Sequence, residues 1–399
     1  MAGGRTLRAA GPAWSRRSLL RAGAVGAAVP AVLAACGTPP AATSASSSRP
    51  PVPDLSDSDK RLVFSNWQLY IDVDDDDPQK RPTLDEFTRR TGIEVDYVED
   101  IVDTEAFYAK VAPQLKAGQP IDRDIVVPTE EVAARMIRQG LVQPFDRANT
   151  PNVTAQLLPS LRDPAWDPGR AQSTPWQTGL TGIAYHAGRT GEVRTIDELL
   201  TRADLRGKVT LLTEWRDSAG LVMLEQGADP ESFTDDEYAA AVAAVQQAVD
   251  AGQVRRFTGN DYTAGLANGT VHACLAWSGD IVQMQADDPQ IRFVEPEAGM
   301  MIWADAMLIP QGAAHKRNAE KLTDYYYEPD VAARLAAWVQ YISPVSGARE
   351  AMEKVDPELV DNPLIFPDDE FLARTHTFMD VDAEQEKRYA QAWTSLMGG

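Results

Sequence analysis

Short apolar runs alternate with amphipathic helical patterns from Arg61 onward in this 399-residue chain, and this alternation restricts the fold more than any other feature. Strands that alternate with helices form α/β folds with parallel or mixed sheets. The chain is also long enough for two domains or two lobes. We therefore predict an α/β fold with strands at Leu62–Phe64, Ile93–Val98, Ile125–Val127, Gly182–Tyr185, Val209–Leu212, Val271–Trp277, Ile291–Val294 and Met301–Ile309.

Cap residues mark several helix ends between these strands. Thr83 with Glu86, and Thr234 with Glu237, have the spacing of capping boxes, in which each side chain bonds the backbone of the other residue. A glycine after a helical pattern supplies the left-handed conformation that often ends a helix. Three helices are accordingly predicted to end at Gly92, Gly140 and Gly252.

Two long segments, Ser173–Tyr185 and Gly299–Pro310, could each cross from one domain to another. Two such crossovers would make two lobes with a hinge and an interlobe ligand cleft, as in type II periplasmic-binding proteins. We predict the first part of lobe 1 at residues 61–174, lobe 2 at 175–300 and the return to lobe 1 at 301–350. Residues 351–399 are predicted to form a C-terminal helical segment that packs across the lobes.

The first 35 residues have the pattern of an export signal. Five arginines precede an uncharged run from Ala22 to Ala35, which is too short to span a membrane as a helix. Ser15–Arg21 resembles a twin-arginine signal, and Leu33–Cys36 resembles a bacterial lipobox, whose cysteine is lipidated. We predict export by the twin-arginine route, lipidation of Cys36 and a flexible Pro/Ser-rich tether at residues 36–60.

The strongly acidic composition restricts the partners. The formal net charge is −21, and removal of the signal, with its five arginines and no acids, lowers the charge to −26. Nucleic acid is excluded as a partner because its phosphates require basic side chains. Cationic ligands are favoured through long-range attraction. After processing, Cys274 is the one cysteine besides Cys36, and its apolar surroundings indicate a small buried hydrophobic residue.

Motifs of the common enzyme classes are absent from the sequence. It contains no G-x-S-x-G elbow, no Walker loop and no G-x-G-x-x-G fingerprint. The acidic run Asp72–Asp77 lacks the glycine and glutamate of a calcium loop and is interpreted as a solvated loop. We therefore predict no catalytic residues, cofactor or metal site. Glu214 and Asp217 could in principle form a glycosidase pair, and nothing in the sequence selects that role over binding.

Asp305 lies in the otherwise apolar stretch Gly299–Pro310, where an unpaired carboxylate costs several kcal/mol. Asp305 forms a cluster with Trp303, and three further clusters combine aromatic or acidic residues near predicted strand ends. Aromatic faces attract ammonium groups by roughly 0.5–2 kcal/mol, and carboxylates add charge-assisted hydrogen bonds. A linear di- or polyamine matches this chemistry. The clusters are Trp67 with Tyr70, Glu214 with Asp217, Trp277 with Asp280, and Trp303 with Asp305.

These motifs, taken in order, resemble the spermidine/putrescine-binding proteins, which are the substrate-binding components of polyamine ABC transporters. The resemblance runs from about Leu62 to the C-terminus, through NWQLY, DIVVPT, PWQTGLTGIAY, LLTEWRD, AWSGD, WADAMLIP and YISPVSG. It implies two α/β lobes that close on a ligand, without catalysis. The ligand contacts it implies are Trp67, Tyr70, Thr129, Glu214, Asp217, Trp277, Asp280, Trp303, Asp305 and Tyr341.

The sequence departs from the family pattern at three places. Leu69 stands where an acid is common, and Glu130 or Glu131 replaces an aromatic residue after Thr129. A contact glutamine near the C-terminus is missing, with Met379 close to its position. These departures leave the preferred polyamine open.

The resemblance implies an extracytoplasmic protein, anchored to the bacterial cell membrane by lipid, that delivers polyamine to the permease subunits of an ABC importer. We expect a monomer. The alternatives are a binding protein for another cationic or small organic ligand and, third, a lipoprotein hydrolase. Stabilisation by amines, sugars or metals would distinguish them.

Overall fold

The computed structural model describes residues 53–74, 76–379 and 381–398. The predicted signal, the lipobox and Cys36 lie outside these residues. Among the described residues, no helix has the length and apolar character needed to cross a membrane.

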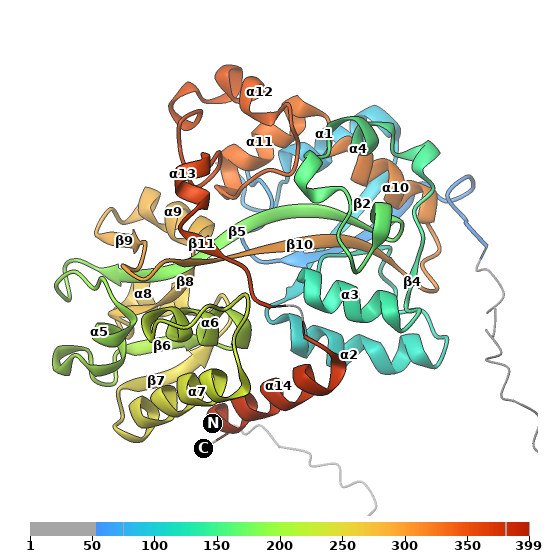
Figure 1. Cartoon of the computed structure of the whole chain (residues 1–399). Coiled ribbons are helices and arrows are strands. Elements are labelled where there is room, and N and C mark those ends of the chain that lie inside the picture. The colour runs from blue at the N-terminus through green and yellow to red at the C-terminus, as the bar shows by residue number, and fades with distance from the viewer. Residues whose placement is uncertain (1–52, 75, 380, 399) are drawn as a thin grey trace, which may run out of the picture. The chain divides into compact units, whose positions relative to one another are not determined.

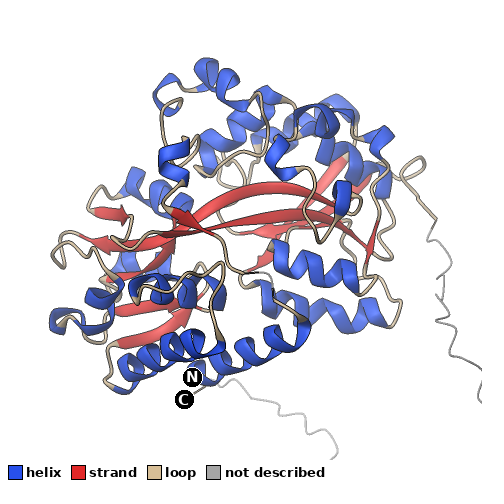
Figure 2. Cartoon of the chain, in the orientation of Figure 1, coloured by secondary structure: helices blue, strands red, loops and turns tan. Residues whose placement is uncertain are grey.

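A mixed sheet forms the centre of the structure (Figure 2). Neighbouring strands follow the order β2-β1-β3-β10-β5-β8-β6-β7, while β4 and β11 pair with β10, and β9 pairs with β5. The strands are β1 (Arg61–Trp67), β2 (Glu94–Ile101), β3 (Ile125–Val126), β4 (Val142–Gln143), β5 (Ser173–His186), β6 (Val209–Leu212), β7 (Val254–Thr258), β8 (Ala273–Trp277), β9 (Ile291–Val294), β10 (Met300–Pro310) and β11 (Thr375–His376).

Helices cover the sheet on both sides (Figure 1). Lobe 1 is built on β1–β4 and carries α1 (Pro82–Thr91), α2 (Thr104–Lys116), α3 (Glu130–Arg138), α4 (Pro151–Gln156), α10 (Lys316–Tyr325), α11 (Pro329–Val339) and α12 (Ala348–Val355). Lobe 2 is built on β6–β9 and carries α5 (Ile196–Thr201), α6 (Trp215–Glu225), α7 (Asp235–Asp250), α8 (Tyr262–Asn268) and α9 (Ser278–Asp287). The C-terminal segment adds α13 (Asp369–Leu372) and α14 (Ala383–Met397). The buried apolar core is continuous from β1 to β8.

The antiparallel pair β5 and β10 joins the two lobes. Leu308 of β10 pairs with both Ser173 of β5 and Val126 of β3, so this end of the pair belongs to lobe 1. From Thr181 onward, β5 pairs with β8 of lobe 2. Both long segments therefore do pass between the lobes. On β5, pairing with β8 begins at Thr181, within the predicted segment Ser173–Tyr185.

The eight predicted strands are all present, and their ends lie within three residues of the predicted ones, except that β5 begins at Ser173, nine residues before the predicted start at Gly182. Three strands were not predicted: β4, β7 and β11. Two of them contain only two residues, which is too short for a periodic pattern. The third, β7, has exposed Arg255 and Arg256 at its centre and forms the edge of the sheet, so its apolar signal is weak.

One of the two predicted capping boxes is present. The Thr234 side chain accepts from the Glu237 N–H, and Glu237 bonds back to the Thr234 backbone. The box predicted for Thr83 and Glu86 is wrong. Pro82 begins α1, Arg81 is its N-cap, and both the N–H and the hydroxyl of Thr83 bond the Asp72 carboxylate instead.

Asp72 is correspondingly buried, so the prediction that the whole acidic run is solvated is wrong at this residue.

The tether predicted at residues 36–60 ends earlier than predicted. The Leu55 N–H donates to the Ala314 carbonyl oxygen at 2.7 Å, and the buried Ser56 hydroxyl accepts from the Asn318 N–H at 3.1 Å. These bonds fix the chain to lobe 1 several residues before β1.

Candidate functional site

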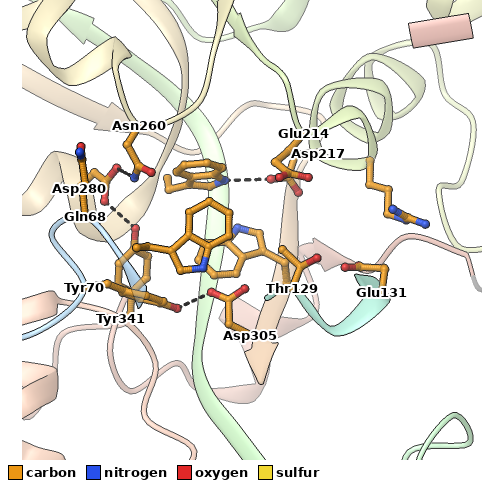
Figure 3. Close-up of a pocket in the computed structure, with 14 residues that line it drawn as sticks. Gln68, Tyr70, Thr129, Glu131, Glu214, Asp217, Asn260, Asp280, Asp305 and Tyr341 are labelled. Carbon is orange, nitrogen blue, oxygen red and sulfur yellow. Dashed lines mark hydrogen bonds between the residues drawn. The ribbon is translucent and has the colours of Figure 1, made fainter. Parts of the chain in front are cut away.

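A pocket lies where β1, β3, β6 and β8 end, so its walls come from both lobes (Figure 3). Ligand sites in α/β folds commonly occupy the carboxyl ends of the strands. All ten residues predicted as ligand contacts line this pocket. Gln68, Glu131, Arg216 and Asn260 also line it and were not predicted.

Three indole N–H groups that line the pocket are held by protein oxygens, which fixes the orientation of the rings. Trp67 donates to the Val127 carbonyl oxygen at 2.7 Å, Trp277 to the Asp217 carboxylate at 2.9 Å, and Trp303 to the Thr181 hydroxyl at 2.9 Å. Satisfied indole N–H groups make a buried tryptophan rigid and apolar toward the pocket.

Five aromatic rings follow one another along the pocket with edge-to-face or tilted geometry. Ring centroids lie 5.9 Å apart for Trp67 and Trp277, 6.2 Å for Trp277 and Trp303, and 5.5 Å for Trp303 and Tyr341. Tyr341 lies 5.1 Å from Tyr70. The result is a narrow lining of ring faces, which suits the methylenes of an extended chain.

A glycine on β5 makes room for Trp303. The register pairs Trp303 with Gly179 across the two long strands. A Cβ atom at Gly179 would come within 2.3 Å of the indole Cζ2, far inside van der Waals contact. The indole can therefore lie across β5 only because this position lacks a side chain.

Asp305 lies in an irregularity of β10, where the pairing with β5 shifts between Ala304 and Ala306. Bulges of this kind often redirect a side chain next to a functional site. The carboxylate is 2% exposed, and its Oδ2 accepts from the Tyr70 hydroxyl at 2.8 Å (Figure 3). Its Oδ1 is buried with no hydrogen-bond partner in the described part of the chain. Burial, opposed by the Tyr70 hydrogen bond, raises the pKa of Asp305 well above its ordinary value.

Asp280 lies at one end of the pocket, in the first turn of α9. It accepts from Asn260 Nδ2 at 2.8 Å, Tyr262 Oη at 2.8 Å and Tyr341 Oη at 3.0 Å. Burial raises the pKa of Asp280 to about 6, although these three donors favour the charged form. Asn260 and Tyr262 follow the unpredicted strand β7, so the sequence patterns gave no reason to select them.

Glu214 and Asp217 lie at the start of α6. Burial raises the pKa of Asp217 to about 6, against the hydrogen bond from Trp277. Glu214 accepts from the Thr104 N–H of lobe 1 at 3.1 Å, and burial raises the pKa of Glu214 well above its ordinary value. Thr129 precedes α3 on the facing wall, where it forms an isolated bridge with Asp305.

The residues that depart from the family pattern differ in where they lie relative to the pocket. Glu131 lines the pocket, whereas Glu130 pairs with the buried Arg170 at 2.8 Å. The Leu69 carbonyl oxygen accepts from Gln283 at 3.1 Å, with Leu69 in the left-handed region at a φ of 57°. The half-buried Met379 is not among the pocket-lining residues.

Arg216 stands between Glu214 and Asp217 in the sequence and also lines the pocket. Its guanidinium stacks on the Trp215 ring at 4.2 Å and binds Glu386 at 2.7 Å. Its charge is thus directed to α14, while the four buried carboxylates line the rest of the pocket.

Among residues 53–74, 76–379 and 381–398, no three His, Cys, Asp or Glu side chains are grouped to hold a metal ion. Rigid ring faces and buried carboxylates can instead enclose an organic cation, because the rings attract positive charge and the acids pair with N–H donors. The two lobes and the pocket between them define the class of two-lobe solute-binding proteins.

The family of bacterial extracellular solute-binding proteins matches residues 83–367, and the chain belongs to this family. Among characterised relatives, the spermidine/putrescine-binding periplasmic protein 1 of Haemophilus influenzae is 28% identical over 304 residues, covering 75% of this chain and 80% of that protein. The spermidine/putrescine-binding periplasmic protein of Escherichia coli is 27% identical over 350 residues, covering 86% and 93%.

Solved structures of low identity share the fold. The TpPotD lipoprotein of Treponema pallidum superposes with a TM-score of 0.69 at 22% identity, covering 85% of this chain and all of that one (100%). The spermidine/putrescine ABC transporter substrate-binding protein PotD of Streptococcus pneumoniae gives 0.66 at 23% identity, with 84% and 98% covered. The prediction of a two-lobe α/β fold is confirmed.

Proposed function

We propose that this protein captures polyamines of the spermidine or putrescine type outside the cytoplasm and delivers them to an ABC importer. The observation that carries the proposal is Asp305 Oδ1, a buried oxygen without a hydrogen-bond partner among the described residues. Such an atom loses its hydration without gaining a protein hydrogen bond. The desolvation penalty is about 1–3 kcal/mol, and it is larger for a charged group. A ligand ammonium would supply the missing donor and the missing charge.

The same contacts support a linear diamine that lies along the pocket. One ammonium meets Asp305 beside Tyr70, and the methylenes lie against the rings of Trp277 and Trp303. A second ammonium then reaches either Asp280 at one end or Asp217 with Glu214 at the other. Relatives named for spermidine and putrescine binding support this ligand class.

Binding requires no chemistry on the ligand, and we assign no catalytic role to the acids. Glu214 and Asp217 are each held by a donor, the Thr104 N–H and the Trp277 indole N–H, which suits a fixed receptor for ammonium groups. We propose that the lobes move about the β5–β10 pair, with lobe boundaries near residues 174, 300 and 350. The protein would act as a monomer that meets the permease subunits with its lobes closed.

A thermal-shift screen tests the ligand class. Putrescine and spermidine are expected to raise the melting temperature, because a ligand at 100 times its Kd stabilises by about 2.7 kcal/mol. The matched control is 1,4-butanediol, which has the same chain length as putrescine but no charge and should have no effect. Stabilisation by sugars, neutral diols or metal ions, with none from amines, would overturn the proposal.

We further propose that the protein is exported by the twin-arginine route and anchored through lipid on Cys36. Replacing Cys36 by alanine is expected to move the protein from the membrane fraction to the soluble extracytoplasmic fraction, because acyl chains provide the anchoring free energy. Cell fractionation measures this. Cys274→Ala is the matched control, since this buried cysteine lies in β8, and the variant should stay with the membrane. A Cys36→Ala protein retained in the membrane fraction would contradict lipid anchoring.

A further inference from the structure

The C-terminal helix α14 is attached to lobe 2 by apolar and polar contacts. Tyr389 packs on Tyr238 of α7 with ring centroids 4.3 Å apart, and its carbonyl oxygen accepts from the Tyr238 hydroxyl at 2.9 Å. Trp393, 1% exposed, packs on Phe257 of β7. Arg388 adds an exposed ion pair with Asp235 of α7. These contacts make α14 part of lobe 2.

One side chain of α14 reaches the other lobe. Glu386 Oε1 accepts from Arg135 of α3 in lobe 1 at 2.6 Å and from Arg216 of α6 in lobe 2 at 2.7 Å. Arg138 of α3 lies 3.8 Å from Glu386 Oε2. Figure 1 shows α14 running from α7 toward α2 and α3, across the junction of the lobes.

The group is partly desolvated, which makes it stronger than a surface ion pair. The side chains of Glu386, Arg135 and Arg216 are 10%, 14% and 11% exposed. Arg135 is further held by two 2.7 Å hydrogen bonds to Glu105 of α2. Burial disfavours the charge of Glu386, but Arg135 and Arg216 outweigh it and keep the pKa of this carboxyl below its ordinary value. Charge-assisted bonds of this geometry are about twice as strong as neutral ones.

We propose that Glu386 is a latch that holds the two lobes together around the cleft, and so a positioning residue for ligand retention. It does not line the pocket, but its partner Arg216 does. The same carboxylate therefore also balances a positive charge that would otherwise face a cationic ligand. The expected effect of the latch on polyamine binding rests on the proposed function. The expected effect on lobe closure does not.

The test compares three variants by small-angle X-ray scattering without ligand. Glu386→Gln removes the latch charge, and Arg135→Gln removes the closer of its two lobe 1 partners while leaving Arg216 paired. Glu384→Gln is the matched control, since Glu384 is an exposed residue of the same first helical turn. We expect a larger radius of gyration for the first two variants than for the control. If Glu386→Gln does not fold, Arg135→Gln carries the test. Equal radii in the folded variants and the control would overturn the latch.

Calorimetric titration with putrescine gives the second readout. Glu386→Gln is expected to bind about tenfold more weakly or worse, mainly through faster dissociation, as is usual when a buried charged contact is truncated. Unchanged affinity would overturn the role in ligand retention. A wild-type protein that binds no polyamine would instead overturn the proposed function, and the ligand-free scattering comparison would still decide the latch.

Discussion

Replacing Asp305 by asparagine is expected to weaken polyamine binding by about 30- to 5,000-fold, which corresponds to roughly 2–5 kcal/mol. The substitution keeps the volume of the side chain and removes its charge. The ligand ammonium would then be buried against Tyr70 and a neutral amide without its counter-ion. Isothermal titration with putrescine and spermidine measures the change. Asp96→Asn, at an exposed position of β2, is the matched control and should bind as wild type does.

The ligand-free Asp305→Asn protein is expected to melt no lower than wild type. Burial raises the pKa of Asp305 in the folded protein above its value in the unfolded chain, so charging this carboxyl destabilises the folded state. Asparagine removes that penalty, while its amide can still bond Tyr70. Weak binding together with an undiminished melting temperature would separate a ligand-binding role from a structural one. Wild-type affinity in this variant would show that the carboxylate serves the fold alone.

Polyamine affinity is expected to rise between pH 5 and pH 8, by about tenfold for a ligand that pairs with one of Asp217 and Asp280 and by about 100-fold for a ligand that pairs with both. Asp217 and Asp280 have pKa values of about 6 in the empty pocket and must lose their protons to pair with ammonium groups. Each therefore weakens binding about tenfold at pH 5, where it is mostly protonated, and hardly at all at pH 8. The amines stay protonated over this range, since alkylammonium groups titrate near pH 10. Asp305 and Glu214, whose pKa values are also raised, act in the same direction.

Calorimetry in two buffers of different ionisation enthalpy checks this, because it counts the protons released as the ligand binds. Proton release that is large at pH 5–6 and vanishes toward pH 8 is the expected result. The ligand-free protein should show the opposite trend in stability. With folded-state pKa values above those of the unfolded chain, Asp217 and Asp280 lower the free energy of unfolding as pH rises from about 4 to about 6. An affinity independent of pH would mean that these acids are not ligand contacts.

The sequence predicted the pocket lining well because its residues adjoin strands with strong apolar patterns. Trp67 and Trp277 end β1 and β8, and Asp305 interrupts β10, so each stands out against its neighbours. Parallel strand ends converge in an α/β fold, which brings such residues together although they are far apart in sequence. Their role in ligand binding remains a prediction.

Other features depend on tertiary contacts that no local pattern contains. Asn260 acts on Asp280 only because the loop after β7 folds back against α9. Thr83 has capping-box spacing, yet its hydroxyl bonds Asp72 because the preceding loop brings that acid to the start of α1. Glu386 and Arg135 are separated by most of the chain, and neither stands out in a periodic helix of mixed charges. Long-range polar pairs of this kind require the fold itself.

A crystal structure of the putrescine complex tests the central claim most directly, through the distance from Asp305 Oδ1 to the nearest ligand nitrogen. We predict a distance of about 2.7–2.9 Å, typical of a bond between an ammonium and a carboxylate, with the methylenes against Trp277 and Trp303. A complex in which Oδ1 remains without a ligand partner, or in which putrescine binds away from this pocket, would contradict the account.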